Sequence, residues 1–296
     1  MRRFALIAVP FLWLSALFLV PFLIVFKISL SDTAMAIPPY QPHLDLSNGW
    51  TGVKEFLQGL DLANYLFLAG DSLYLKAYLN SLWVAVTSTV LTLLAAYPIA
   101  YGMACTPRRW RPTLMMLVIL PFWTSFLIRV YAWIGILATD GYLNQLLLGL
   151  GLISEPLVML NTNFAVYVGI VYTYLPFMVL PIYSALEKFD GSLLEAAEDL
   201  GCSRLSAFWL VTFPLSRPGI IAGCFLVFIP AVGEFVIPSL LGGSSTLMIG
   251  SVLWGEFFNN RDWPIASSVA VILLLLLIIP IVLFQRYLQK QREAGL

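Results

Sequence analysis

Six stretches of about twenty mostly apolar residues recur along this chain, at 6–26, 79–104, 113–137, 164–186, 219–241 and 265–284. A helix needs roughly 20 such residues to cross the hydrocarbon core of a bilayer. Only 11% of the residues are charged, whereas a soluble domain carries about 25%. A soluble fold of this composition would leave large apolar patches in water. The sequence therefore predicts an all-α, polytopic membrane protein with six transmembrane helices in a single domain, residues 1–296.

Lysine and arginine are distributed unevenly among the segments that join these stretches. If the N-terminus is inside, the cytoplasmic segments hold eleven basic residues and the outer segments hold three, Lys54, Lys76 and Arg261. Cytoplasmic loops of membrane proteins are enriched in basic residues, so we expect both termini in the cytoplasm. A cleaved signal peptide is the alternative for the first stretch, but its apolar core is longer than the usual run of about 7–15 residues.

Two ionisable residues, Arg129 and Glu234, lie well inside the predicted spans. A charge in the middle of a spanning helix costs roughly 2–3.5 kcal/mol or more, so both side chains should face the interior of the bundle. On unbroken helices both would lie roughly 22–24 Å from the cytoplasmic ends of their spans. This equal height permits two interpretations. The residues form an intramembrane ion pair, or Glu234 faces the substrate path and meets a cationic substrate.

Prolines lie inside each of the last three predicted spans. Each proline removes a helical hydrogen bond and frees a carbonyl group, so we expect broken or kinked helices at these positions. They are Pro176 and Pro181 in the fourth span, Pro230 and Pro238 in the fifth, and Pro280 in the sixth.

The predicted cytoplasmic loop 187–217 is amphipathic. Apolar residues follow one stripe of a short helix from Ser192, and Gly201 is placed to end that helix in a left-handed cap. A second amphipathic stretch, Leu205–Phe213, is expected to stop at Pro214. The pattern predicts a helix–glycine–helix hairpin that suits docking into a groove on another protein.

The residues of this loop also carry a family resemblance. Glu195-Ala196-Ala197, then Gly201 after three residues, then Val211-Thr212-Phe213-Pro214 after nine more, resembles the EAA motif of ABC importer permeases. Val211 and Phe213 replace isoleucine and leucine of that pattern, both by apolar residues. The resemblance implies that this loop couples to a cytoplasmic ATPase, with Glu195, Ala196, Ala197, Gly201 and Pro214 as the coupling residues.

Three further segments extend the resemblance. The run from Pro121 to Trp133 and the run from Phe228 to Gly243 look like motifs of putrescine and spermidine permeases, as does Trp254–Trp263, and the match is closest to the putrescine-type permease. This resemblance implies the ABC type I importer permease fold (MetI-like) in a bacterial inner membrane. It also implies a second permease subunit, an ATPase dimer and a periplasmic polyamine-binding protein as partners.

A polyamine is a chain of ammonium groups on an apolar stem, so its path should offer a carboxylate and aromatic faces. The candidates in the predicted spans are Glu234, Trp123, Tyr131 and Tyr174, with Trp133 and Tyr172 as further aromatic residues. The binding protein is expected to supply most of the selectivity, and putrescine is favoured over spermidine.

Other functions predict different residues. The sequence has no G-x-x-x-x-G-K-[ST] loop, so the chain is not expected to be an enzyme or to bind a cofactor, and ATP and Mg²⁺ belong to the partner ATPase. An ion-coupled secondary transporter should carry more intramembrane acids and an inverted repeat. The sequence lacks the usual motifs of membrane enzymes, and the sole histidine, His43, has no neighbouring metal ligand. An ABC permease for a different small solute remains the nearest alternative.

Overall fold

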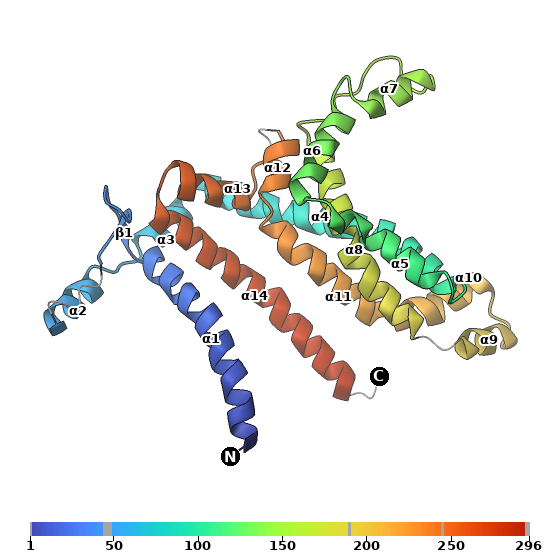
Figure 1. Ribbon diagram of the computed structural model, residues 1–296, viewed down its shortest axis with the longest axis horizontal. Helices are drawn as coiled ribbons and strands as arrows, with labels where there is room; N and C mark the ends of the chain where they lie inside the picture. Colours follow the sequence, from blue (N-terminus) through green and yellow to red (C-terminus); the bar gives the residue numbers. More distant parts are fainter. Residues whose placement is uncertain (1, 44–48, 189–190, 244–245, 294–296) are drawn as a thin grey trace. The chain divides into compact units, whose positions relative to one another are not determined.

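The computed structural model describes residues 2–43, 49–188, 191–243 and 246–293, and these are mostly helical (Figure 1). The longer helices are α1 (Arg2–Ser29), α4 (Ser72–Cys105), α6 (Phe126–Leu137), α8 (Asn163–Glu187), α11 (Phe213–Val232) and α14 (Trp263–Glu293). Shorter ones are α2 (Gly49–Gln58), α3 (Ala63–Gly70), α5 (Arg111–Ile119), α7 (Tyr142–Gly149), α9 (Ser192–Asp199), α10 (Arg204–Ala207), α12 (Val236–Leu241) and α13 (Ile249–Trp254). A 3₁₀ turn, η2 (Leu120–Trp123), and two π-helical turns, η3 (Phe208–Thr212) and η4 (Gly255–Asn259), complete them.

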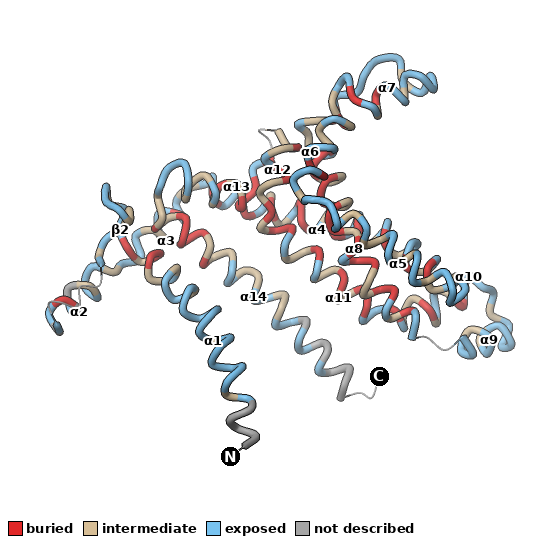
Figure 2. The backbone as a smooth tube through the Cα atoms, in the orientation of Figure 1, coloured by how far each residue is buried: buried red, intermediate tan, exposed pale blue. Residues whose placement is uncertain are grey.

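Six helical segments among the described residues are long and apolar enough to cross a bilayer. They are Ile7–Ser29, Ser72–Cys105, Phe126–Gly149, Asn163–Glu187, Arg204–Val232 and Trp263–Leu283. The predicted number of six spanning helices is therefore confirmed, but the third segment is Phe126–Gly149 rather than the predicted 113–137. The first segment differs from the rest because no residue of its apolar window is buried against the chain (Figure 2).

The chain divides into two compact units. The first comprises residues 1–77 and 249–283, and the second comprises residues 78–248 and 284–296. Helices α4 and α14 each run through both units, and the prediction of a single membrane domain stays a prediction.

Polar contacts hold the first unit together at the end of α1. The carbonyl of Ser29 accepts hydrogen bonds from Asn64 Nδ2 (3.1 Å) and from Ser268 Oγ on α14 (3.0 Å). A two-stranded antiparallel ribbon follows α1, in which β1 (Asp32–Thr33) pairs with β2 (Tyr40–Gln41). Lys27 Nζ donates to the Pro42 carbonyl (2.9 Å) and lies 4.1 Å from the centroid of the Tyr40 ring. These contacts fasten the ribbon to α1.

The core of the second unit is the pair α8 and α11, which lie side by side with their buried residues facing each other (Figure 2). Gly219 and Gly223 of α11 form a G-x-x-x-G pattern. A Cβ atom at Gly219 would lie 2.5 Å from the Pro181 carbonyl oxygen, and one at Gly223 would lie 2.7 Å from Met178 Sδ. Glycine lets two helix backbones approach closely in a membrane, where packing drives helix association.

Two of the predicted spans are not continuous helices. In 113–137, Thr124 and Ser125 are extended, with ψ of 154° and 138°, and separate η2 from α6. In 219–241, α11 ends at Val232 and α12 begins at Val236. The estimate of equal heights for Arg129 and Glu234 assumed unbroken helices, so it does not hold.

The breaks do not lie at the prolines. Helix α8 continues through Pro176 and Pro181, and α14 continues through Pro280. Helix α11 continues through Pro230 and ends two residues later. These prolines therefore do not break their helices, because neighbouring turns keep the helical path where one hydrogen bond is lost, and kinking at these positions stays a prediction.

We predict that Gly219→Ala lowers the stability of the protein by roughly 1–3 kcal/mol, because the added methyl group meets backbone atoms of α8. The midpoint of thermal unfolding in detergent measures the effect. Gly102→Ala in α4 is the control, because a Cβ atom there has no neighbour within 4 Å. Equal midpoints for the two variants would contradict the close packing of α8 on α11.

Candidate functional site

The loop between α8 and α11 forms the helical hairpin that the sequence predicts, although residues 189 and 190 lie outside the described residues. Helix α9 is followed by Gly201, whose φ of +88° is left-handed, and the Gly201 amide donates to the Glu198 carbonyl (2.9 Å). The left-handed cap at Gly201 is confirmed. Helix α10 then begins at a Ser203 cap, whose Oγ accepts from the Ser206 amide (3.2 Å). The predicted coupling residues lie on α9 (Glu195, Ala196 and Ala197), at its end (Gly201) and at the start of α11 (Pro214).

The hairpin exposes large apolar side chains. Leu200 is 87% exposed and Leu205 is 69% exposed, on either side of Gly201. Leu193 on α9 and Leu210 in η3 are also exposed. Apolar side chains gathered on one short element and left uncovered indicate a surface that another molecule covers.

The second half of the hairpin does not stop at Pro214. Helix α10 passes through η3 directly into α11, and the whole stretch Arg204–Val232 forms one candidate span. In η3 the Phe213 amide donates to the Phe208 carbonyl, five residues back. Pro214 then lies in the first turn of α11, where its missing N–H costs little. The expected stop at Pro214 is therefore wrong, and the hairpin is joined rigidly to α11.

Aromatic side chains join η3 to α4. The Phe208 ring lies edge-on to the rings of Tyr97 (5.8 Å between centroids) and Tyr101 (5.5 Å). The Tyr97 hydroxyl lies 3.1 Å from Oγ of the buried Ser216 on α11. The hairpin therefore contacts α4 as well as the two helices that it connects.

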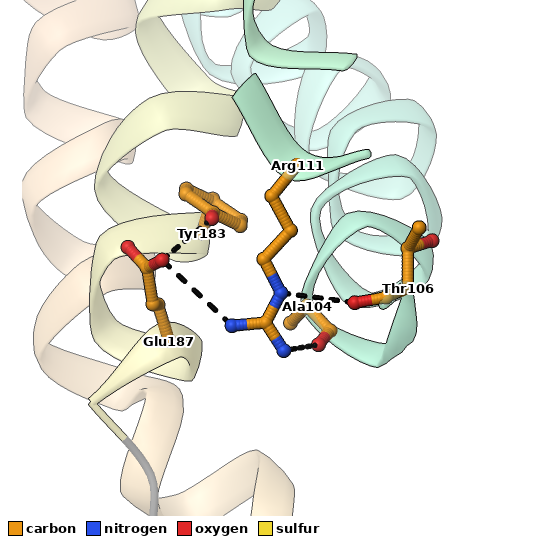
Figure 3. Close-up of polar contacts among 5 residues, drawn as sticks. All are labelled: Ala104, Thr106, Arg111, Tyr183 and Glu187. Carbon is orange, nitrogen blue, oxygen red and sulfur yellow. Dashed lines mark hydrogen bonds and ion pairs between the residues drawn. The ribbon is translucent and has the colours of Figure 1, made fainter. Parts of the chain in front are cut away.

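A polar cluster around Arg111 lies at the end of α4, the start of α5 and the end of α8 (Figure 3). Arg111 Nε donates to the Thr106 carbonyl (2.9 Å), and its Nη2 donates to the Ala104 carbonyl (2.8 Å). Its Nη1 lies 3.7 Å from Oε1 of Glu187, the last residue of α8. The Tyr183 hydroxyl donates to the same oxygen (2.8 Å). One guanidinium group therefore contacts the ends of two helices.

Glu234 lies in the break between α11 and α12, and it is buried. Its Oε1 accepts hydrogen bonds from the amides of Val236 (3.0 Å) and Ile237 (3.4 Å), at the start of α12. Its Oε2 accepts from the Tyr174 hydroxyl of α8 (2.6 Å). A carboxylate is well suited to unpaired amides at a helix start. The carboxylate therefore satisfies the freed backbone of the break and ties it to α8.

Arg129 does not pair with Glu234 in this structure. The ion pairs among the described residues are Arg111–Glu187 and Arg204–Glu198. Arg129 is 9% exposed, its Nε and Nη1 have no hydrogen-bond partner among the described residues, and its Cζ lies 4.9 Å from the centroid of the Phe122 ring. The structure therefore does not show the predicted ion pair, and the Glu234 oxygens accept hydrogen bonds from Tyr174 and from the start of α12 instead.

The other residues of the predicted path are scattered. Tyr174 is buried beside Glu234, whereas Trp123 and Tyr131 are 71% and 57% exposed on η2 and α6. Trp133 and Tyr172 pack edge-on, with 5.4 Å between ring centroids, and join α6 to α8. The structure therefore brings Tyr174 to Glu234 and leaves the remaining aromatic residues apart from it.

The sequence predicts neither the Arg111 cluster nor the contact of Phe122 with Arg129. In the sequence, Arg111 is only one of the basic residues of the segments expected in the cytoplasm. Its partner Glu187 is 76 positions away in the sequence, and no motif or periodicity links the two. Only the folded arrangement of α4, α5 and α8 reveals the pairing.

Residues 67–293 match the family model described as "Binding-protein-dependent transport system inner membrane component". The chain belongs to this family. Its members are multi-pass permease components of the inner membrane, which agrees with the six candidate spans.

Curated relatives of this family member carry a substrate in their names. The chain is 39% identical over 280 residues to the "Spermidine/putrescine transport system permease protein PotB" of Haemophilus influenzae, covering 95% of this chain and 92% of the relative. It is 45% identical over 225 residues to the protein of the same name from Escherichia coli K12, covering 76% of this chain and 82% of the relative. These names join spermidine and putrescine, so the preference for putrescine stays a prediction.

Solved structures confirm the fold. A bacterial ABC transporter involved in the import of the acidic polysaccharide alginate matches with a TM-score of 0.62 at 16% identity, over 96% of both chains. The same kind of transporter in complex with its periplasmic protein matches with a TM-score of 0.63 at 16% identity, over 92% of both chains. The MetNI methionine ABC transporter matches at 0.55 and 16% identity, over 73% of this chain and 94% of that one. The predicted ABC importer permease fold is therefore confirmed.

We predict that Tyr174→Phe lowers the stability of the protein by roughly 1.5–3 kcal/mol, because a buried bond to the Glu234 carboxylate is lost while the ring remains. The thermal unfolding midpoint in detergent is the measurement. Tyr131→Phe is the matched control, since the exposed Tyr131 hydroxyl has no hydrogen-bond partner within the part of the chain that the structure describes. An unchanged midpoint for Tyr174→Phe would contradict the proposed link between α8 and the break.

Proposed function

We propose that this chain is the permease subunit of an ABC importer that moves a polyamine across the inner membrane. Putrescine is the favoured substrate and spermidine the next. The energy comes from ATP hydrolysis on a separate subunit, so the chain itself is not an enzyme and binds no cofactor. Both termini lie in the cytoplasm in this proposal, in agreement with the excess of lysine and arginine in the segments on that side.

The observation that carries the proposal is the hairpin of α9 and α10, with its exposed Leu200 and Leu205 around the left-handed Gly201. In the proposed orientation this hairpin lies in the cytoplasm, where uncovered leucines are unfavourable. A groove on an ATPase dimer would cover them. A second permease and a periplasmic polyamine-binding protein complete the proposed assembly, as the family resemblance implies.

The packing of the second unit suggests how the hairpin drives transport. Helix α10 continues through η3 into α11, and α11 packs on α8 through Gly219 and Gly223. A movement of the hairpin would therefore carry α8 and α11 together. The bond from Tyr174 to Glu234 lies further along the same pair. ATP-dependent motion would in this way reach the break between α11 and α12.

The substrate is assigned from the relatives and from Glu234. At 39–45% identity, the relatives named for spermidine and putrescine transport support a polyamine. Glu234 offers a carboxylate that a diamine could use when the break rearranges, with Tyr174 beside it for contact with an ammonium group. An ABC permease for another small solute is the second candidate, because the hairpin itself says nothing about the solute.

We predict that cysteines placed at Ala197 and Leu200, in a chain without its native cysteines, cross-link to the ATPase subunit in membranes. Leu200 is 87% exposed on the hairpin. Leu152→Cys is the control, because Leu152 is 68% exposed on a segment expected to lie outside. Absence of cross-links from both hairpin positions, in a membrane preparation where the ATPase is present, would exclude the coupling role.

We also predict that Glu234→Gln lowers the kcat/KM of polyamine uptake about tenfold or more, since it removes the charge and one of the acceptors that hold the break. Uptake into proteoliposomes and substrate-stimulated ATP hydrolysis measure the effect. Glu155→Gln changes an exposed carboxylate on the expected outer side and serves as the control. Wild-type uptake and ATP hydrolysis in Glu234→Gln would rule out a role of Glu234 in the path.

A further inference from the structure

Arg111 occupies a position where a cation is unfavourable unless it has partners elsewhere. It is the first residue of α5, and the start of a helix carries a partial positive charge. Its side chain reaches the end of α4 instead, where Nε and Nη2 donate to the carbonyl groups of Thr106 and Ala104. Carbonyl groups at a helix end lack partners within the helix, and a guanidinium group satisfies them well. Arg111 therefore joins the start of α5 to the end of α4.

The third arm of the same guanidinium group points to α8 (Figure 3). Glu187 is the last residue of α8, and its Oε1 lies 3.7 Å from Arg111 Nη1. The Tyr183 hydroxyl, one turn earlier on α8, donates to that oxygen and orients the carboxylate (2.8 Å). Helix α9, the first helix of the hairpin, begins at Ser192. The contact therefore lies immediately before the hairpin in the chain.

A second ion pair in the same unit shows the difference between this contact and an ordinary surface pair. Arg204 lies 3.8 Å from Glu198, and its side chain is 95% exposed. Such exposed pairs contribute little. The Arg111 side chain is 21% exposed and contacts two carbonyl groups in addition to the carboxylate. Three groups therefore hold the Arg111 guanidinium group in position.

We propose that Arg111 is a positioning residue for transport, which transmits the movement of the hairpin from Glu187 on α8 to α4 and α5. This inference rests on the proposed function, since it requires that the hairpin is moved by an ATPase. Without Arg111, α8 and α11 would still follow the hairpin, but α4 and α5 would follow incompletely. The ATPase would then hydrolyse ATP with less transport for each ATP consumed.

The test uses the complete transporter in proteoliposomes, with the partner permease, the ATPase and the binding protein. Putrescine uptake and ATP hydrolysis are measured on the same preparation, and their ratio is compared between variants. Arg111→Gln should lower the putrescine transported per ATP roughly threefold to tenfold, while the amount of co-purified ATPase is unchanged. Glu187→Gln should lower the ratio by a similar factor, because it removes the ion pair with α8, whereas the two carbonyl bonds of Arg111 join only α5 to α4. Glu187→Asp, which keeps the carboxylate, should give a ratio between those of Glu187→Gln and the wild type.

The double variant Arg111→Gln with Glu187→Gln should be no worse than Arg111→Gln alone, as expected for two residues that act through one contact. Arg109→Gln is the matched control. It removes a charge of the same sign two residues before Arg111, and the Arg109 side chain is exposed. A wild-type ratio in Arg111→Gln would overturn the inference. So would an equal loss in Arg109→Gln, since it would indicate a general effect of charge. If Arg111→Gln fails to assemble, a wild-type ratio in Glu187→Gln overturns the inference instead.

The outcome for the wild-type transporter separates this inference from the proposed function. No ATP-driven uptake of putrescine or spermidine by the wild type would overturn the proposed function. Normal wild-type uptake, with an unchanged ratio in the Arg111 and Glu187 variants, would overturn the role of Arg111 alone.

Discussion

The close contact between α8 and α11 is the interaction on which the second unit depends. Gly219 and Gly223 bring the two backbones together so closely that a methyl group at either position meets atoms of α8. In a bilayer, where apolar side chains gain nothing from leaving lipid, such packing takes the place of the hydrophobic effect. Both helices also border the hairpin of α9 and α10, so their contact makes the hairpin the end of one stiff element rather than a flexible loop.

Helices α8 and α11 also explain how the break between α11 and α12 is tolerated. Between α11 and α12 the backbone leaves the helical path, and in hydrocarbon an unpaired amide would cost several kcal/mol. Glu234 accepts from two amides of α12 and from Tyr174 of α8, so the break is satisfied from within the chain. Arg129, beyond the other break, has two buried nitrogen atoms without hydrogen-bond partners in the part of the chain that the structure describes, and its guanidinium group contacts the Phe122 ring. The carboxylate is thus hydrogen-bonded within the fold and the guanidinium group is not, although the sequence presents the two charges as equivalent.

The sequence predicts the parts of the fold that depend on composition and local pattern. Six long apolar stretches are enough to predict the spanning helices, and Gly201 predicts a left-handed cap because few other residues adopt that conformation. The sequence does not predict the contacts between segments that are distant in the chain. The prolines of α8 do not mark the breaks, Pro214 does not end the hairpin, and Glu234 is paired with Tyr174 rather than with Arg129. These outcomes depend on which backbone groups a neighbouring helix satisfies, and the periodicity of one helix carries no such information.

The central claim, that α8 and α11 move as one body with the hairpin, is tested most directly by distances between spin labels on the two helices. Phe177 on α8 and Leu226 on α11 are exposed positions that suit labelling. Pulsed EPR on the reconstituted transporter, at rest and with nucleotide trapped on the ATPase, would measure their separation. If α8 and α11 move as one body, the distance distribution is the same in both states. A shift of the distribution between the two states would show that the helices separate, and it would contradict the claim.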